Sequence, residues 1–325
     1  MKNLRTAITS SLLCAMALGQ SALANDYPDR AVTIVVPYTA GGPADLLIRA
    51  MGESLSKTWG EPVIVDNKPG ANEVIAAQAV ARSKPDGYTW LVASDSIFSL
   101  NQHLYSKLPY DPIKDFEPVT KLVTANLMLV TRKDFPANNV KEWVQYIKQN
   151  PGKVNYGSVG VGGVNHLGMA WISEQEQLQM QHVPYKGLAQ GLQDIVSGRL
   201  DTMFAVIGGA VPFLNSDRLK AIAVSGDQRS EIAPNVPTFT EQGYPKFDAS
   251  FYFAIAAPKG TPAPIIDKFA RDASVVVQDA NFQKRFLREL GFVGVGDTPQ
   301  TFAEFLVTDR AEAAAKVKAS GAKLD

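Results

Sequence analysis

The sequence predicts an α/β protein of two domains, each a mainly parallel sheet flanked by helices. Two observations carry this prediction. Short runs rich in valine, isoleucine and alanine alternate with amphipathic helical patterns, which is typical of βαβ units with right-handed crossovers. A stretch rich in proline and charge, residues 108–118, interrupts the alternation, which then resumes. We therefore expect one α/β set before this stretch and a second set after it.

The first set contains three strands and two helices. An apolar run ends in Pro37, and a helical pattern follows in which Leu47, Met51 and Leu55 recur along one face. A turn signal at residues 84–87 (KPDG) ends the second helix. In order, the predicted elements are a strand at 31–37, a helix at 43–59, a strand at 62–66, a helix at 72–82 and a strand at 88–93.

The second set repeats this alternation. Strands are predicted at residues 126–131, 154–158, 181–184, 202–206 and 219–224, and helices at 140–149, 164–174 and 189–197. A proline-punctuated loop at 231–246 ends the set. A strand at 250–257 and helices at 263–277, 281–290 and 299–316 complete the chain.

The last strand and helices have no third sheet to join, so we expect them to return to the first domain. This assigns residues 25–125 plus 250–325 to domain 1 and residues 126–249 to domain 2. The chain would then cross between the domains at least twice. Such a connection forms a hinge, and we expect a ligand cleft where the strand ends of both domains meet.

The first 24 residues read as a secretory signal peptide. Lys2 and Arg5 precede a short apolar core, and the small-x-small pattern of residues 22–24 predicts cleavage after Ala24. The core is too short for a membrane-spanning helix. It contains the only cysteine, Cys14, so the mature chain has no disulfide and no cysteine-based metal site. We therefore expect a periplasmic protein.

Charge excludes several classes of partner. The full chain balances 32 basic against 32 acidic residues, and cleavage would remove two basic ones. A nearly neutral protein of this kind has no electrostatic signature for nucleic acid or for an anionic membrane surface. We expect a monomer without a cofactor.

The first candidate site is the stretch VVPYTAGGPADLLIRA, from Val35 to Ala50. Gly41 and Gly42 can adopt backbone angles closed to other residues, and Pro43 suits the first position of a helix. The amides of a helix start attract anions such as carboxylate or phosphate, although a simple tight turn would give the same pattern. The required Lys-Ser/Thr and G-x-G-x-x-G signals are missing, which excludes nucleotide loops. The candidate residues are Tyr38, Thr39, Ala40, Gly41, Gly42 and Asp45.

Asp45 lies on the first turn of this predicted helix. It has two possible roles, to cap amides of the turn or to meet a ligand amine or an ordered water.

The second candidate site, YGSVGVGGVNH at residues 156–166, repeats this arrangement. A short strand runs into glycines before a helix, and two anion sites facing one cleft could hold both ends of a dicarboxylate. The hydrolase elbow G-x-S-x-G is not matched, because Tyr156 occupies the first glycine position. His166 is expected to cap or pack, and the three histidines lack metal-ligand spacing. The candidate residues are Ser158, Gly162, Gly163, Asn165 and His166.

Further candidates follow other predicted strands, because open α/β sheets bind ligands at their carboxyl ends. They are Ser94, Tyr185 and Lys186. An aromatic residue on the domain surface beside a solvated lysine is the alternative for the last two. Four aromatic residues could form walls that suit an aromatic carboxylate, while short aliphatic dicarboxylates remain open: Tyr38, Phe98, Tyr185 and Tyr252.

The ordered motifs resemble those of the Bug receptors, the TctC-like solute-binding proteins of tripartite tricarboxylate transport systems. They cover nearly all of the mature chain: IVVPYTAGGPAD at 34–45, PVIVDNKPGA at 62–71, KPDGYT at 84–89, YGSVGVGGVNHL at 156–167, HVPYKG at 182–187 and GLQDIVSGRLDTMF at 191–204. The resemblance implies a Venus-flytrap fold of two α/β domains. It also implies a small carboxylate in the interdomain cleft, held by the amides of residues 39–45 and 158–166, and delivery to a membrane permease.

Three places depart from the family pattern. After Pro69-Gly70-Ala71 the family usually continues with further glycines, whereas this chain has Asn72 and Glu73. This change places a carboxylate in a cleft loop. Valines at positions 159, 161 and 164 and Gln190-Gly191 are the other departures, and all three bear on the distal part of the pocket.

The leading hypothesis is therefore a periplasmic receptor that binds a small carboxylate and performs no chemistry on it. One alternative is a ligand-sensing partner of a sensor kinase, which shares the binding chemistry. Another is a secreted serine hydrolase with Ser158 or Ser94 as nucleophile and His166 as base, although no spacing in the chain promotes that triad.

Overall fold

The computed structural model describes residues 27–185, 187–245, 247 and 249–324. The predicted signal peptide and its cleavage site, as well as Lys186, lie outside the described residues. Within the described part, no helix is both long and apolar enough to cross a membrane.

The strands form two similar sheets, joined through one long strand. In the first, β1 (Val32–Val36) pairs in parallel with β2 (Val63–Asn67) and β3 (Thr89–Ser94). In the second, β5 (Val154–Ser158) pairs in parallel with β6 (Met180–Pro184) and β7 (Thr202–Val206). The prediction of an α/β fold with two mainly parallel sheets is confirmed.

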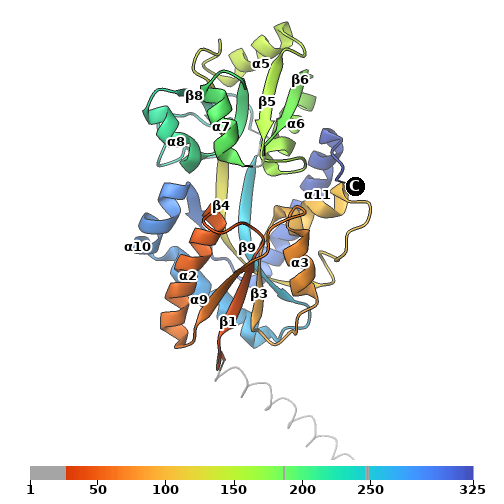
Figure 1. The fold of residues 1–325 in the computed structure, drawn as a ribbon, viewed down its shortest axis with the longest axis vertical. Helices are drawn as coiled ribbons and strands as arrows, with labels where there is room; N and C mark the ends of the chain where they lie inside the picture. The colour runs from red at the N-terminus through yellow and green to blue at the C-terminus, as the bar shows by residue number, and fades with distance from the viewer. Residues whose placement is uncertain (1–26, 186, 246, 248, 325) are drawn as a thin grey trace, which may run out of the picture.

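The long strand is β4 (Phe116–Arg132), which belongs to both sheets and pairs antiparallel with β9 (Ser250–Pro258) of the first sheet. The strand order is β2-β1-β3-β9-β4-β7-β5-β6, so each parallel trio is closed by one antiparallel strand. Up to Asn126, β4 pairs with β9; from Leu127 onward it pairs with β7 and with β8 (Leu219–Val224). Figure 1 shows β4 and β9 running through the middle of the molecule, with one sheet below and the other above.

The long strand differs from the sequence prediction, which placed a loop at 108–118 and a strand only at 126–131. The ladder begins at Phe116, and Val119, Leu122 and Val123 are buried there. Register shifts after Pro118 and after Lys121 explain the miss, because bulges disturb the alternation on which the prediction rests. The proposed domain boundaries at 125/126 and 249/250 lie where the pairing of β4 changes, and the division stays a prediction.

Most of the other elements match their predicted positions within one or two residues. These helices are α2 (Pro43–Trp59), α3 (Val74–Ala81), α5 (Val140–Gln149), α6 (Val164–Gln175), α7 (Leu188–Val196) and α9 (Ala263–Gln278). The elements that the sequence analysis missed are η1 (Ser96–Leu100), α4 (Asn101–Leu104), α8 (Ile207–Asn215) and β10 (Phe292–Gly294). The predicted helix at 281–290 is irregular, with α10 (Ala280–Phe282), η2 (Gln283–Leu287) and η3 (Arg288–Leu290).

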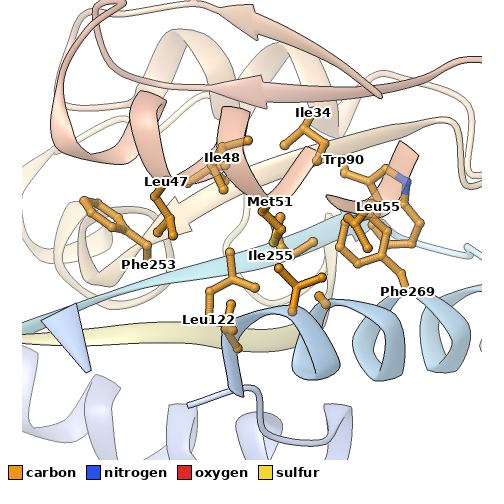
Figure 2. Packing of buried hydrophobic residues seen from close by; sticks show 14 of the residues in the cluster. Ile34, Leu47, Ile48, Met51, Leu55, Trp90, Leu122, Phe253, Ile255 and Phe269 are labelled. Carbon is orange, nitrogen blue, oxygen red and sulfur yellow. The ribbon is translucent and has the colours of Figure 1, made fainter. Parts of the chain in front are cut away.

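The core of the first half lies on both faces of its sheet. On one face, α2 places Leu47, Met51 and Leu55 against the sheet, and Phe269 of α9 stacks on Trp90 with 4.1 Å between ring centroids (Figure 2). On the other face, α3, η1 and the last helix α11 (Pro299–Ser320) cover β1, β3 and β9. As predicted, the C-terminal elements therefore return to the first sheet.

Helix α11 also reaches the second half, which the sequence did not predict. Leu167 of α6 packs in one buried cluster with Leu100 and Leu104 of the first half and with Ala313 and Val317 of α11. Burial of these side chains adds a non-covalent connection beside the two strands.

This cluster predicts a large effect of one substitution. Leu167→Ala deletes buried methyl groups at the junction and should lower the free energy of unfolding by about 2–5 kcal/mol. The control is Leu46→Ala on α2, whose side chain is 49% exposed, and it should change stability by less than about 0.5 kcal/mol. Urea unfolding measures both variants, and equal stabilities would contradict the packing.

Candidate functional site

The first glycine loop, residues 39–45, joins β1 to α2. Gly41 has φ +82°, in the left-handed region, and Gly42 is the N-cap of α2 with φ −78°. The Gly41 amide donates to Oδ2 of Asp45 at 2.8 Å. The glycine pair therefore makes a sharp turn whose shape is held by a side chain four residues on.

Asp45 fixes this loop to the sheet. Its carboxylate also accepts from Nε of Arg49 and from Nδ2 of Asn67, both at 2.9 Å, and its side chain is buried. Burial raises the pKa of Asp45, but the hydrogen bonds from Arg49, Gly41 and Asn67 outweigh it and hold the pKa below its usual value. Of the two roles expected for Asp45, the structure shows the capping one.

The second glycine loop, residues 158–166, joins β5 to α6 and repeats this geometry. Gly162 has φ +79°, and Gly163 is the N-cap with φ −73°. The Gly162 amide donates to Nδ1 of His166 at 3.2 Å, again four residues on. Burial, and then the neighbouring His182, lower the pKa of His166 to about 4, so its ring is neutral and can accept this bond.

Both loops leave helix-start amides without acceptors among the described residues. The first intrahelical bonds run from Leu46 to Gly42 and from Leu167 to Gly163, each at 3.0 Å. The amides that precede them have no partner there, and they belong to Ala44 and Asp45 in one loop and to Val164, Asn165 and His166 in the other. Such amides, with the helix dipole behind them, form an anion site.

The fold orients the two loops alike. They follow β1 and β5, the central strands of the two equivalent trios, and both lie at the ends of their sheets that face the other half (Figure 1). The second loop touches the first half directly, because a methyl group on Gly162 would lie 2.8 Å from Leu104.

A cavity of about 110 Å³ lies beside the second loop, between the halves. Its walls come from α6, β4, β9, η1 and α11, and from Asp95 between β3 and η1; they include Lys121, Val164, Asp309 and Lys316. Charged side chains of both signs therefore reach the space between the halves.

Tyr38 and Ser94, two of the predicted ligand contacts, are held by Glu73. Both hydroxyls donate to Oε1 of this residue at 2.6 Å. Burial raises the pKa of Glu73 to about 6, although the bonds from Ser94 and Tyr38 act in the opposite direction. Glu73 appeared in the sequence only as a departure from the family pattern, and its partners could not be read there.

Ser158 contacts a different histidine from the one considered in the hydrolase hypothesis. Its Oγ lies 2.6 Å from Nε2 of His182, which is stacked between His166 and Tyr156. Ser158 is fully buried, and no carboxylate bonds to either histidine in the described part of the chain. The pair lacks the exposed nucleophile and the orienting acid of a hydrolase.

Hydrogen bonds or burial hold the side chains of the remaining predicted residues. The hydroxyl of Tyr185 donates to Asp194 at 2.9 Å, and its ring packs with the second half's own core. Phe98 is buried under α11, and Tyr252 bonds to Asp309. Asn165 donates its side-chain amide to the carbonyl of Phe204 at 2.6 Å, which leaves its backbone amide as the group available to a ligand.

Each glycine pair predicts an asymmetric response to substitution. Gly41→Ala forces a Cβ into the left-handed region and should lower the free energy of unfolding by about 1–2 kcal/mol. Gly42→Ala is the matched control, because its φ is ordinary and its new Cβ would lie 3.4 Å from the Thr39 carbonyl oxygen. Thermal unfolding compares the two, and an equal loss in both would refute the assigned turn.

The raised pKa of Glu73 predicts that the stability of the protein depends on pH. Its pKa of about 6 lies above its usual 4.5, so ionisation costs the folded state stability as pH rises from about 4.5 to 6. Glu73→Gln removes this cost, and the variant should exceed the wild type by about 2 kcal/mol at pH 7.5. The gain should disappear below pH 4.5. Urea unfolding across this pH range tests the prediction, which a pH-independent difference would contradict.

Comparison with known proteins supports a receptor family. The family model described as "Tripartite tricarboxylate transporter family receptor", TctC, matches residues 47–321. The periplasmic binding protein BugD is 33% identical, with a TM-score of 0.78, over 91% of this chain and 99% of BugD.

Two structures with bound ligands are similarly close. The R. palustris protein Rpa4515 with adipate is 30% identical, with a TM-score of 0.82, over 92% of this chain and all of that one. MatC of Rhodopseudomonas palustris with malate is 31% identical, with a TM-score of 0.78, over 90% of this chain and all of that one. The chain belongs to the TctC family of tripartite tricarboxylate transporter receptors, also known as Bug receptors, and is a solute-binding protein rather than an enzyme.

Proposed function

We propose that this protein captures a small carboxylate in the periplasm, between the two glycine loops, and delivers it to the membrane subunits of a tripartite transporter. One observation carries the proposal. The same turn, with the same helix-start amides left free, occurs on the equivalent central strand of each sheet. An anion between the halves would receive hydrogen bonds from both, which favours the closed form over the open one.

The relatives support a carboxylate as the ligand. The structures of Rpa4515 and MatC hold adipate and malate, which are both aliphatic dicarboxylates. The leader at residues 1–24 supports export, and the family name supports a membrane permease as partner.

A sensor kinase is the second candidate for the membrane protein that binds the closed, ligand-bound form. It requires the same ligand and the same closure, so the binding site does not separate it from transport. Pull-down of membrane proteins with and without ligand separates them, because a permease and a kinase are distinct partners. We favour transport because the family model describes transporter receptors.

Removal of one free amide tests the proposal. Val164 stands at the first position of α6, where proline is favoured and where α2 carries Pro43. Val164→Pro removes the amide hydrogen and replaces the isopropyl group by the proline ring, and loss of a hydrogen bond to a charged ligand should weaken binding by about 1.5–3 kcal/mol, or about 10- to 100-fold. Calorimetric titration with adipate and malate, and with matched monocarboxylates, measures the loss.

The control is Val164→Ala, which also shortens the side chain but keeps the amide. The proposal expects the alanine variant to bind close to wild-type strength while the proline variant does not. If both variants bind equally well, the second glycine loop does not hold the ligand.

A further inference from the structure

Glu73 has a buried carboxylate oxygen without a hydrogen-bond partner at the strand ends of the first half, within the described part of the chain. Oε1 accepts both hydroxyls, from Tyr38 after β1 and from Ser94 at the end of β3. Oε2 has no hydrogen-bond partner within the described part of the chain, although the side chain is only 6% exposed. A buried carboxylate oxygen without a donor is costly, so the site is complementary to a group that donates hydrogen bonds.

The backbone holds this carboxylate in place at the expense of strain. Ala71, Asn72 and Glu73 have φ of +47°, +49° and +73°, three successive non-glycine residues in the left-handed region. Asn101 secures the segment by donating to the Asn72 carbonyl at 2.9 Å, and Tyr105 donates to the Ala71 carbonyl at 3.1 Å. Glu73 is the N-cap residue of α3, yet its side chain makes no capping bond and turns to the hydroxyls instead.

Acidic and basic side chains lie together in the cavity between the halves. Asp95 follows Ser94 directly and lines the interdomain cavity; burial, and then the charges of Asp309 and Glu73, raise its pKa to about 8, so it is largely neutral at pH 7. Lys121 and Lys316 line the same cavity, next to Asp309. Lys121 lies over the Phe305 ring at 3.6 Å. The hydroxyls that would otherwise receive a ligand carboxylate are already bonded to Glu73.

If the ligand had two carboxylates, its second one would therefore lie beside the Glu73 carboxylate. The nearby hydroxyls of Tyr38 and Ser94 could not donate to it, because they already donate to Glu73. We propose that the ligand of this receptor carries a cationic amine as well as a carboxylate, with the carboxylate on the glycine-loop amides and the amine on Oε2 of Glu73. This inference rests on the proposed function, since it assumes that the glycine loops hold the carboxylate. A protonated amine supplies the missing donor and the opposite charge together.

Calorimetric titration of the purified mature protein with matched ligand pairs tests the inference. The pairs are adipate with 6-aminohexanoate, succinate with 4-aminobutanoate, and hexanoate with norleucine, so that the amine is placed at either end of the chain. The wild type should bind at least one amino carboxylate tenfold or more tightly than its partner. Glu73→Gln should weaken binding of that amino carboxylate at least tenfold and should strengthen binding of the dicarboxylates adipate and succinate.

Glu53→Gln is the control, because Glu53 lies exposed on α2 and pairs with Lys57, and it should leave all affinities unchanged. If the wild type binds dicarboxylates more tightly than every amino carboxylate, the inference fails and the proposed function stands. If no carboxylate of either kind binds, both fail. The wild-type preference decides the matter even if Glu73→Gln does not fold.

Discussion

The antiparallel pair β4–β9 is the constraint on which the rest of the structure depends. Strand β4 belongs to both sheets and pairs with β9 in the first and with β7 in the second, so its backbone hydrogen bonds fix the order of the two parallel trios and the direction in which their carboxyl ends point. The helix starts at those ends face one another only because of this pairing. Closure around a ligand would have to act through this pair and against the contact between α11 and α6.

The two glycine loops form the same type of turn with different side chains. In each, a left-handed glycine donates to the residue four positions on, which is Asp45 in one loop and His166 in the other. The charged Asp45 and the neutral His166 are equivalent here, because each only has to accept a hydrogen bond from a backbone amide of the turn. In our proposal the free helix-start amides hold the ligand, and backbone donors suit a site that must bind and then release its ligand without chemistry.

Glu73 lowers the stability of the fold, yet we propose that it contributes to ligand recognition. It fills the position between Tyr38 and Ser94, and the fold carries both a buried carboxylate and three left-handed residues to keep it there. Strain of this kind persists where the surroundings over-determine the backbone, and it is common at ligand sites. The relatives with bound adipate and malate show that the fold accepts dicarboxylates.

The sequence by itself determined the α/β class, the positions of most helices and strands, and both glycine loops, because these depend on local periodicity and on the backbone freedom of glycine. The spacing from Gly41 to Asp45 and from Gly162 to His166 is also visible there, although its meaning as a turn closed by a hydrogen bond is not. Only the tertiary structure decided that β4 begins at Phe116, that Ser158 meets His182, and that Glu73 binds Tyr38 and Ser94. These contacts join residues far apart in the chain, so they depend on strand pairing, and no local pattern encodes them.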